Sequence, residues 1–286
     1  MCVEPSTAKP RIVASLSGGK DSVAMLLALI ERHGASIIAH YQALPEDWPE
    51  TLPYVQAVCG KLGVRLVAQQ MIYEPVGDGT QVRRKQVRDI HTEGDIVPWG
   101  TDGAIAGVTD LAFRRQWPPS AGVRFCTRYF KISLLDAWIR QHRLEFGADV
   151  HVALGERAAE SPRRAKKLPL SERFTSYGLT VSNWLPVHQW PRRDIFRKMR
   201  DWGIEPHPAY KAQGMADWQM YDEDAESGPR TSCLFCVYAG YEQCCHQAQA
   251  ETNQGLLRRM VAFEQATGRT WWARRSATEL LASLSN

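Results

Sequence analysis

The feature that most constrains the fold is an apolar run, residues 11–16, that ends abruptly in a polar turn. The turn consists of Ser17, Gly18, Gly19, Lys20, Asp21 and Ser22. A helical composition follows, so the pattern predicts a buried strand over 11–16, a tight glycine turn and a helix over 21–33. Adjacent glycines remove the Cβ atoms that would keep an anion away from backbone N–H groups. The positive end of the helix and the Lys20 ammonium add to this attraction, so the turn is predicted to hold phosphate.

The rest of the N-terminal half repeats the alternation of strands and helices. Short apolar runs predict strands at 36–42, 64–68 and 150–154. Helical segments are predicted between them, at 49–62 and 131–146. Such βαβ units favour an α/β fold with a parallel sheet and helices on both faces. Ligands of these sheets bind beyond the carboxyl ends of the strands, which is where the Ser17–Ser22 turn falls.

Other parts of the chain are less regular. Residues 74–122 are expected to form an insertion or lid, and the polar, basic stretch 80–95 is predicted to be a mobile helix. Two helical stretches are predicted near the C-terminus, at 250–267 and 276–284. We find no internal repeat and no low-complexity tract.

Composition and charge narrow the class of protein. In 286 residues with 44% hydrophobic content, no run approaches the ~18 apolar residues that a membrane helix needs. The first ten residues lack the apolar core of a signal peptide, so a cytoplasmic location is expected. The net charge is only +4, but basic residues cluster at 83–85, 163–167, 192–193 and 274–275. These clusters are either solvated faces or a cationic groove for a nucleotide or nucleic acid.

The hexapeptide SGGKDS resembles the SGGxDS signature of the PP-loop ATP pyrophosphatases, the adenine nucleotide alpha hydrolase superfamily. It is not the common P-loop, because the required spacing before Gly-Lys-Ser/Thr is absent. A second motif, Gly155 through Arg163, resembles the GxRxxES…R element of the phosphoadenosine phosphosulfate reductase-like branch. The resemblance spans about residues 11–240.

That resemblance implies a Rossmann-like nucleotide-binding domain over 1–180 and a C-terminal region with a cysteine cluster and helices over 181–286. It implies ATP as the nucleotide, with its β and γ phosphates on the Ser17–Ser22 turn, and Mg²⁺ placed with the help of Asp21. Lys20, Asp21 and Arg157 are the implied catalytic residues. The implied nucleotide-binding set adds Ser17, Gly18, Gly19, Ser22, Gly155, Glu160, which orients the Arg157 guanidinium, and Arg163.

Cysteine spacing points to metal or redox chemistry. The chain has seven cysteines, and in a cytoplasmic protein these favour metal binding over disulfides. Cys233-x-x-Cys236 brings two thiolates within reach of one metal. The expected ligands are Cys126, Cys233, Cys236 and Cys244. The resemblance favours a [4Fe–4S] cluster over zinc. Cys245 in place of Cys244, a three-cysteine site with one open iron, and a site without metal stay open.

The leading hypothesis is an ATP-dependent sulfurtransferase, similar to the DNA phosphorothioation and tRNA-thiolating enzymes of the superfamily. It would cleave ATP to AMP and pyrophosphate, adenylate an acceptor and receive sulfur from a donor such as a cysteine desulfurase. DNA, tRNA, a peptide and a metabolite are all compatible acceptors, and a homodimer is compatible with the sequence. Two alternatives stay open: a phosphoadenosine or adenosine phosphosulfate reductase or sulfate-activating protein, and a non-catalytic nucleotide- or nucleic-acid-binding subunit. The intact first loop, and an end without a Glu-Cys-Gly tail, count against the reductase.

Overall fold

Seven strands form one sheet in the computed structural model, which describes residues 11–76, 81–120, 122–213 and 230–284. The strands run in the order β4-β3-β2-β1-β5-β7-β6. Their bounds are Arg11–Ser15 (β1), Ile38–Gln42 (β2), Arg65–Val76 (β3), Gln81–Asp89 (β4), Asp149–Leu154 (β5), Leu170–Ser176 (β6) and Leu179–Trp184 (β7). The five central strands, β3, β2, β1, β5 and β7, are parallel to one another. The two edge strands, β4 and β6, each pair antiparallel with their neighbour.

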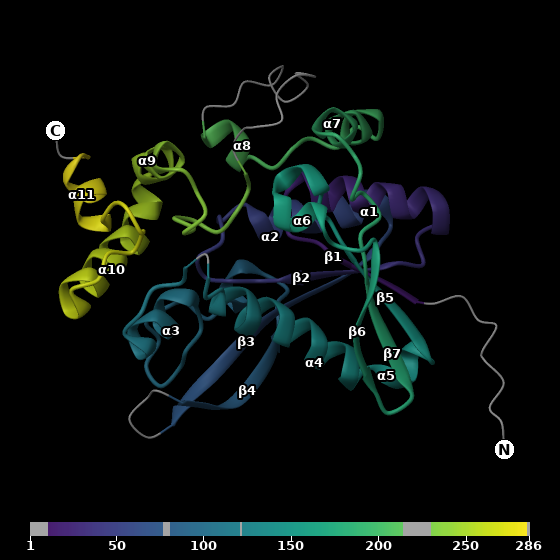
Figure 1. The fold of residues 1–286 in the computed structure, drawn as a ribbon, viewed down its shortest axis with the longest axis horizontal. Helices are drawn as coiled ribbons and strands as arrows, with labels where there is room; N and C mark the ends of the chain where they lie inside the picture. Colours follow the sequence, from purple (N-terminus) through teal and green to yellow (C-terminus); the bar gives the residue numbers. More distant parts are fainter. Residues whose placement is uncertain (1–10, 77–80, 121, 214–229, 285–286) are drawn as a thin grey trace.

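Helices cover both faces of the sheet (Figure 1). On one face lie α1 (Lys20–His33), α2 (Thr51–Leu62) and α7 (Arg192–Asp201), whose buried side chains share a core with β1 and β2. On the other face, α4 (Ser133–Gln141) and α5 (Arg143–Phe146) pack on β1, β5 and β7. The predicted α/β fold, a parallel sheet between helices, is confirmed.

A further apolar core lies beyond the β3–β4 end of the sheet. It joins β3 and α3 (Val108–Arg115) to the C-terminal helices α9 (Tyr241–Gln249), α10 (Glu251–Thr267) and α11 (Ala277–Ala282). The rings of Phe113 and Phe263 meet edge to face there, 5.4 Å between centroids. In Figure 1 these C-terminal helices lie beside α3 at one end of the molecule.

Short helical turns connect these elements. They are η1 (Glu93–Asp95), the π-helical η2 (Thr127–Ile132), η3 (Ala158–Glu160), α6 (Pro162–Ala165) and α8 (Ala209–Ala212). No helix within the described ranges is both long and apolar enough to cross a bilayer.

Two predicted helices differ from the structure. The predicted helix over 80–95 is wrong: Gln81–Asp89 is an edge strand, because β3 extends to Val76 and offers a long antiparallel partner. The basic residues that suggested a helix are typical of an edge strand, where charge discourages pairing with other chains. The predicted helix over 131–146 is divided into the end of η2, α4 and α5, with a break at His142.

Candidate functional site

The glycine turn lies between β1 and α1, at the carboxyl edge of the sheet. Gly18 has φ +77°, and a Cβ there would come within 3.2 Å of the Thr51 methyl group on α2. Both the backbone conformation and the close packing therefore require glycine. The Ser22 hydroxyl donates to the Gly19 carbonyl at 2.8 Å and accepts from the Ser17 N–H at 3.2 Å. The turn is held in shape by its own serines.

Lys20, Asp21 and Arg157 form a compact charged group at the start of α1. The Asp21 carboxylate accepts from Lys20 Nζ at 2.9 Å and from Arg157 Nε at 2.6 Å. Both cationic side chains are more than nine-tenths buried. Burial raises the pKa of Asp21, but the Lys20 and Arg157 charges outweigh it and hold that pKa below its ordinary value. Asp21 is therefore an anion that fixes two cations beside the turn.

The loop after β5 touches this group directly. A Cβ on Gly155 would lie 2.7 Å from the backbone carbon of Asp21 and the nitrogen of Ser22, so only glycine lets the two segments approach. Glu160 accepts from the Arg157 backbone N–H at 2.9 Å, and its carboxylate pairs with Arg164. The guanidinium of Arg157 is bound by Asp21 and by the Trp190 carbonyl, at 3.3 Å. The predicted partner residue Glu160 thus contacts the Arg157 backbone, and Arg163 is an exposed side chain of α6.

Two residues of the segment around α8 support the turn and were not identified as site residues from the sequence. Tyr210 accepts from the Lys20 N–H through its hydroxyl at 3.1 Å. His207 lies under Gly18, with its Nε2 3.1 Å from the Thr51 hydroxyl. Burial lowers the pKa of His207 to about 4, so this ring is neutral at physiological pH. Only the folded chain shows these contacts, because they join residues more than 150 positions apart.

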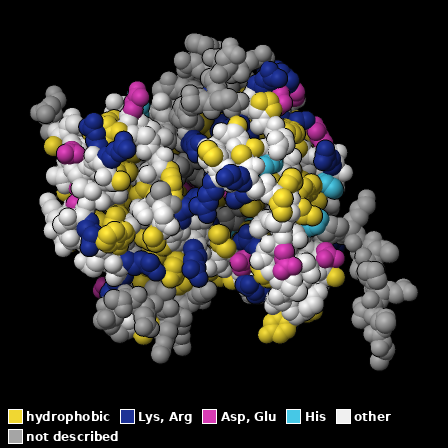
Figure 2. Space-filling view, viewed as in Figure 1, with side chains coloured by type: hydrophobic (Ala, Val, Ile, Leu, Met, Phe, Trp, Pro, Cys, Tyr) yellow, Lys and Arg dark blue, Asp and Glu magenta, His cyan; other side chains and the backbone are white. Residues whose placement is uncertain are grey.

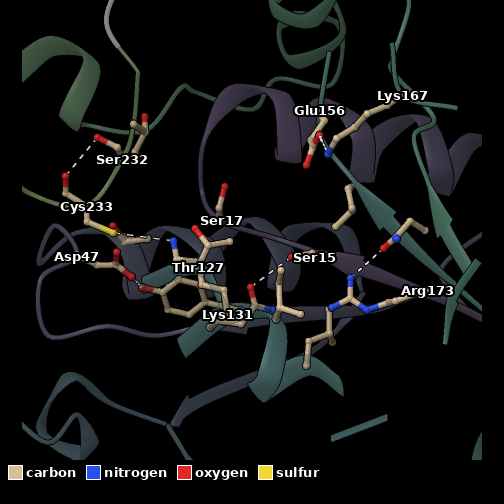
Figure 3. Close-up of a pocket in the computed structure, with 18 residues that line it drawn as sticks. Ser15, Ser17, Asp47, Thr127, Lys131, Glu156, Lys167, Arg173, Ser232 and Cys233 are labelled. Atoms are coloured by element: carbon tan, nitrogen blue, oxygen red, sulfur yellow. Dashed lines mark hydrogen bonds and ion pairs between the residues drawn. The ribbon is translucent and has the colours of Figure 1, made fainter. Parts of the chain in front are cut away.

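A cavity of about 300 Å³ opens at the carboxyl ends of β1, β2, β5 and β7 (Figure 3). Ser17 of the turn lines it, and Cys233 and Lys131 lie across from Ser17. Arg173 of β6 and the ion pair of Lys167 with Glu156 line the opposite end. One hollow is therefore lined by Ser17 of the predicted phosphate turn and by Cys233 of the predicted cysteine ligands, whereas Lys20, Asp21 and Arg157 lie outside its lining.

Burial and neighbouring groups raise the pKa values of three predicted cysteine ligands. Burial raises the pKa of Cys236, and the nearby Cys126 adds to this rise. Burial also raises the pKa of Cys233 well above its ordinary value, with Lys131 opposing it and Cys236 adding to it. The pKa of Cys244 rises to about 12 through burial and then through Cys236. Cys236 thus interacts electrostatically with each of the other three predicted ligands.

Lys131 supplies a positive charge to this cluster. Its Nζ lies 3.9 Å from Cys233 Sγ, and the pKa of Lys131 is raised by Cys233 first and then, against its burial, by Asp47, Cys126 and Cys236. Several free thiols beside one ammonium have the donor chemistry of a thiolate-ligated metal group. In the part of the chain that the structure describes, no three His, Cys, Asp or Glu side chains are close enough to hold a metal ion. Cys244 is only 1% exposed, in the C-terminal core.

Comparisons with known proteins were made on sequence and on structure. No family model and no curated protein matches the chain. Three solved structures with a similar fold are the phosphoadenylyl-sulfate (PAPS) reductase from Candida auris, the FMN adenylyltransferase from Candida glabrata with FMN and the ATP analogue AMPCPP, and the U34-tRNA thiolase NcsA from Methanococcus maripaludis with its [4Fe-4S] cluster.

The extent of these similarities is modest. The reductase is 13% identical over 70% of this chain and 77% of its own, with a TM-score of 0.40. The adenylyltransferase is 11% identical over 73% of this chain and 55% of its own, with a TM-score of 0.41. The thiolase is 10% identical over 96% of this chain and 81% of its own, with a TM-score of 0.35. Such values carry no information on the activity of this chain.

Proposed function

We propose that this protein is an ATP-dependent sulfurtransferase that cleaves ATP to AMP and pyrophosphate. The observation that supports this most directly is the cavity shared by Ser17 of the glycine turn and by Cys233. A nucleotide on the turn and a sulfur-bearing thiol would occupy the same hollow. Neither the turn nor the cysteines alone would favour a transfer reaction.

The turn would bind the β and γ phosphates of ATP. Backbone N–H groups at the start of α1 and the Lys20 ammonium neutralise the diphosphate, while Asp21 keeps Lys20 beside it. Arg157, which Asp21 also holds, would face charge that develops on the α phosphate. Mg²⁺ would bind with the phosphates, next to Asp21. These residues would position and neutralise the reacting groups, which is the main requirement of phosphoryl chemistry.

The reaction would have three steps. An oxygen of the acceptor forms a bond to the α phosphorus, and pyrophosphate leaves. Sulfur then forms a bond to the activated atom of the acceptor, and AMP leaves with the original oxygen. The sulfur would come from a persulfide donor such as a cysteine desulfurase, whose terminal sulfur forms the new bond. The Cys233 thiol, which lines the cavity, would then attack the inner sulfur of the donor, so that the S–S bond breaks and the thiolated acceptor leaves. The disulfide left between Cys233 and the donor would be reduced by a cellular dithiol.

An iron–sulfur cluster would be held by the predicted ligands Cys126, Cys233, Cys236 and Cys244. Their side chains would have to move closer together as it binds, because no three of them are within reach of one metal ion in the described residues. Lys131 would offset the negative charge of the thiolates. When bound, such a group supplies thiophilic iron that can hold sulfur. Because the thiols are buried with raised pKa values, the ligands must lose protons as the group binds. Iron, sulfide and zinc analysis after anaerobic purification tests this part, with Cys59→Ser as the control for the four single cysteine variants.

The test of ATP cleavage uses Lys20→Ala and Asp21→Asn. We expect each variant to release AMP at least roughly a hundredfold more slowly than the wild type, because charge at the diphosphate is lost. Lys61→Ala is the matched control, since the Lys61 ammonium binds the Gly203 carbonyl on the exposed surface. AMP release that is unchanged in both turn variants would refute the assignment of the turn. Binding of adenosine phosphosulfate without AMP formation would favour the reductase alternative.

We also propose a nucleic acid as the acceptor. Tyr238 is 45% exposed, and the Arg124 guanidinium lies over its ring at 4.9 Å. Trp117 is 47% exposed beneath Arg269, at 3.8 Å. Lys and Arg side chains also gather near the middle of the face that Figure 2 shows. Exposed rings flanked by guanidinium groups stack on bases and attract phosphates.

Gel shifts with single-stranded DNA and with tRNA test the acceptor class. Binding that depends on phosphate contacts should weaken steeply between 50 and 200 mM salt, by about tenfold or more. Tyr238→Ala should weaken binding, whereas Leu144→Ala, a control at an exposed apolar side chain without a ring, should not. A shift that does not respond to salt, or no shift with either nucleic acid, would contradict this proposal.

A further inference from the structure

A chain of hydrogen bonds crosses four adjacent strands and ends in the cavity. Asp89 of β4 accepts from Gln69 Nε2 of β3 at 2.7 Å. Gln69 Oε1 lies 3.1 Å from His40 Nε2, and His40 Nδ1 lies 2.7 Å from Gln42 Nε2, both on β2. Gln42 Oε1 accepts from the Ser15 hydroxyl of β1 at 3.3 Å. The strand register aligns Gln42 with Gln69 and Gln69 with Asp89.

The chemistry of Asp89 fixes the direction of every link. An ionised carboxylate only accepts, so the amide nitrogen of Gln69 must face it and the amide oxygen must face His40. His40 then carries its proton on Nε2 and accepts at Nδ1, so the amide nitrogen of Gln42 faces the ring. The same nitrogen also donates to the His40 carbonyl at 3.0 Å, which favours the orientation that the chain of hydrogen bonds from Asp89 imposes.

His40 suits this role because it is neutral. It is fully buried, against the Trp138 ring at 4.8 Å, and burial lowers its pKa to about 4. A neutral imidazole donates from one nitrogen and accepts at the other. The hydrogen bonds on its two sides therefore run in the same direction, with each donor facing towards Asp89.

The last two members of the chain line the cavity. Ser15 gives its proton to Gln42, which leaves the serine oxygen able only to accept from a ligand. Gln42 Oε1 keeps a second lone pair. Apolar side chains of Ile132, Leu135 and Leu154 line the same cavity and suit a flat heterocyclic ring. The Ser15 and Gln42 oxygens therefore offer hydrogen-bond acceptors beside an apolar surface of the cavity.

We propose that Ser15 and Gln42 select the nucleotide by accepting a hydrogen bond from its adenosine moiety, and that Asp89 sets this preference from the protein surface as a positioning residue. The inference rests on the proposed function, because it assumes that the cavity binds ATP. Two donors of adenosine have the required chemistry: the exocyclic amine of adenine and the ribose 2′-hydroxyl.

Calorimetric titration with ATP, inosine triphosphate and 2′-deoxy-ATP distinguishes these donors. Inosine triphosphate carries a carbonyl oxygen in place of the amine, and 2′-deoxy-ATP lacks the hydroxyl. We expect one of the two to bind roughly tenfold more weakly than ATP, since a buried acceptor loses its partner. Equal binding of all three nucleotides would overturn this inference alone. Absence of ATP binding would overturn the proposed function as well.

Asp89 variants test control of that preference from the surface. Asp89 is exposed on an edge strand, so Asp89→Asn should fold. Its amide can donate or accept, so Gln69 and His40 lose the constraint that the carboxylate imposes and Gln42 is oriented less strictly. The ratio of affinities for ATP and the weaker nucleotide should therefore fall several-fold. Asp89→Glu should preserve the ratio, and so should Glu74→Gln, which removes a carboxylate of β3 that contacts Gln86 instead. If Asp89 had a purely structural role, Asp89→Asn would weaken the binding of all nucleotides equally. That outcome, or an unchanged ratio of affinities in Asp89→Asn, would overturn the positioning role.

Discussion

At the scale of single residues, Gly155 links the second motif to the first. Sequence analysis identifies Gly155 through its place before Arg157, but the reason for glycine is a contact that only the fold shows. A Cβ would lie 2.7 Å from backbone atoms of Asp21 and Ser22, and backbone cannot move aside as a flexible side chain can. The loop after β5 and the start of α1 therefore approach each other this closely because residue 155 is a glycine.

Gly155→Ala is therefore expected to separate the two segments. We expect it to lower the free energy of unfolding by about 1–3 kcal/mol through overpacking. It should slow AMP release by roughly tenfold to a hundredfold, because Arg157 is displaced from the turn. Urea unfolding and an AMP-release assay measure the two effects. Gly60→Ala is the matched control, with open space around Gly60 in α2, and should be neutral or stabilising. Equal behaviour of the two variants would contradict the packing argument.

His207 should make stability depend on pH. Its pKa is lowered to about 4 in the folded chain from an ordinary value of 6.5, because burial disfavours the charged ring. Below pH 6.5 the unfolded chain therefore takes up a proton that the folded chain refuses, and stability falls as the pH falls from 6.5 towards 4, by up to about 1.4 kcal/mol per pH unit. Above pH 6.5 the residue adds no pH dependence.

The variant His207→Asn isolates this effect. Its side-chain oxygen can still accept from the Ala209 N–H, which bonds His207 Nδ1 at 3.0 Å, but it cannot titrate. Urea unfolding between pH 7.5 and 4.5 should show a flatter profile for this variant than for the wild type. His91→Asn is the control, because the His91 side chain is exposed. Parallel profiles for wild type and His207→Asn would contradict the prediction.

At the scale of elements, sequence periodicity correctly predicted the strand and the helix whose formation depends on residues close in sequence. The strand before the turn, the helix after it and the closing glycine at Gly34 follow from periodicity and capping, and β1 and α1 match them to within one residue. The edge strand β4 was predicted as a helix, because its conformation depends on pairing with the extended β3. Lys131 was missed as a site residue for a similar reason: its partner Cys233 is 102 positions away.

The C-terminal helices depend on one carboxylate. Glu264 of α10 is 8% exposed and accepts from the backbone N–H groups of Trp271 at 2.7 Å, Ala277 at 2.8 Å and Thr278 at 3.0 Å. It thereby fixes the start of α11 and the loop whose Trp272 indole donates to the Cys236 carbonyl. An uncharged side chain cannot satisfy these donors equally.

Glu264→Gln should lower the free energy of unfolding by about 2–4 kcal/mol, because charge-assisted hydrogen bonds are lost in a buried place. It should also reduce the iron retained on anaerobic purification, since the cysteine loop loses a support. Glu251→Gln, an exposed acid in the first turn of the same helix, should change stability by at most about 1 kcal/mol. Thermal unfolding and iron analysis decide the matter, and matching losses in both variants would point to helix charge alone.

At the scale of the whole molecule, two cores meet at one cavity. The core of β1, β2, α1 and α2 positions the glycine turn, and the core of α3 with the C-terminal helices includes Leu234 and packs against Cys233. The backbone N–H of Leu234 donates to the Glu46 carbonyl at 2.8 Å and ties the cysteine loop to the segment after β2. Motifs about 210 positions apart in the sequence thus line one hollow. Sequence patterns predicted both motifs but not their common cavity, which results from long-range packing.

This arrangement predicts that ATP shields one cysteine in particular. Cys233 lines the cavity with Ser17, whereas Cys245 is a partly exposed side chain of α9 and does not line it. In metal-free protein at pH 8.5, saturating ATP should slow alkylation of Cys233 by iodoacetamide several-fold and leave Cys245 unchanged, as measured by mass spectrometry of tryptic peptides. The raised pKa of Cys233 makes the unprotected reaction slow, so the rates are compared over hours. Lys20→Ala should abolish the protection, because the turn then binds the β and γ phosphates of ATP more weakly. Equal protection of both cysteines would indicate that ATP makes the whole fold less accessible. No protection of Cys233 would mean that the nucleotide and the thiol occupy separate sites. Separate sites are incompatible with direct sulfur transfer between them.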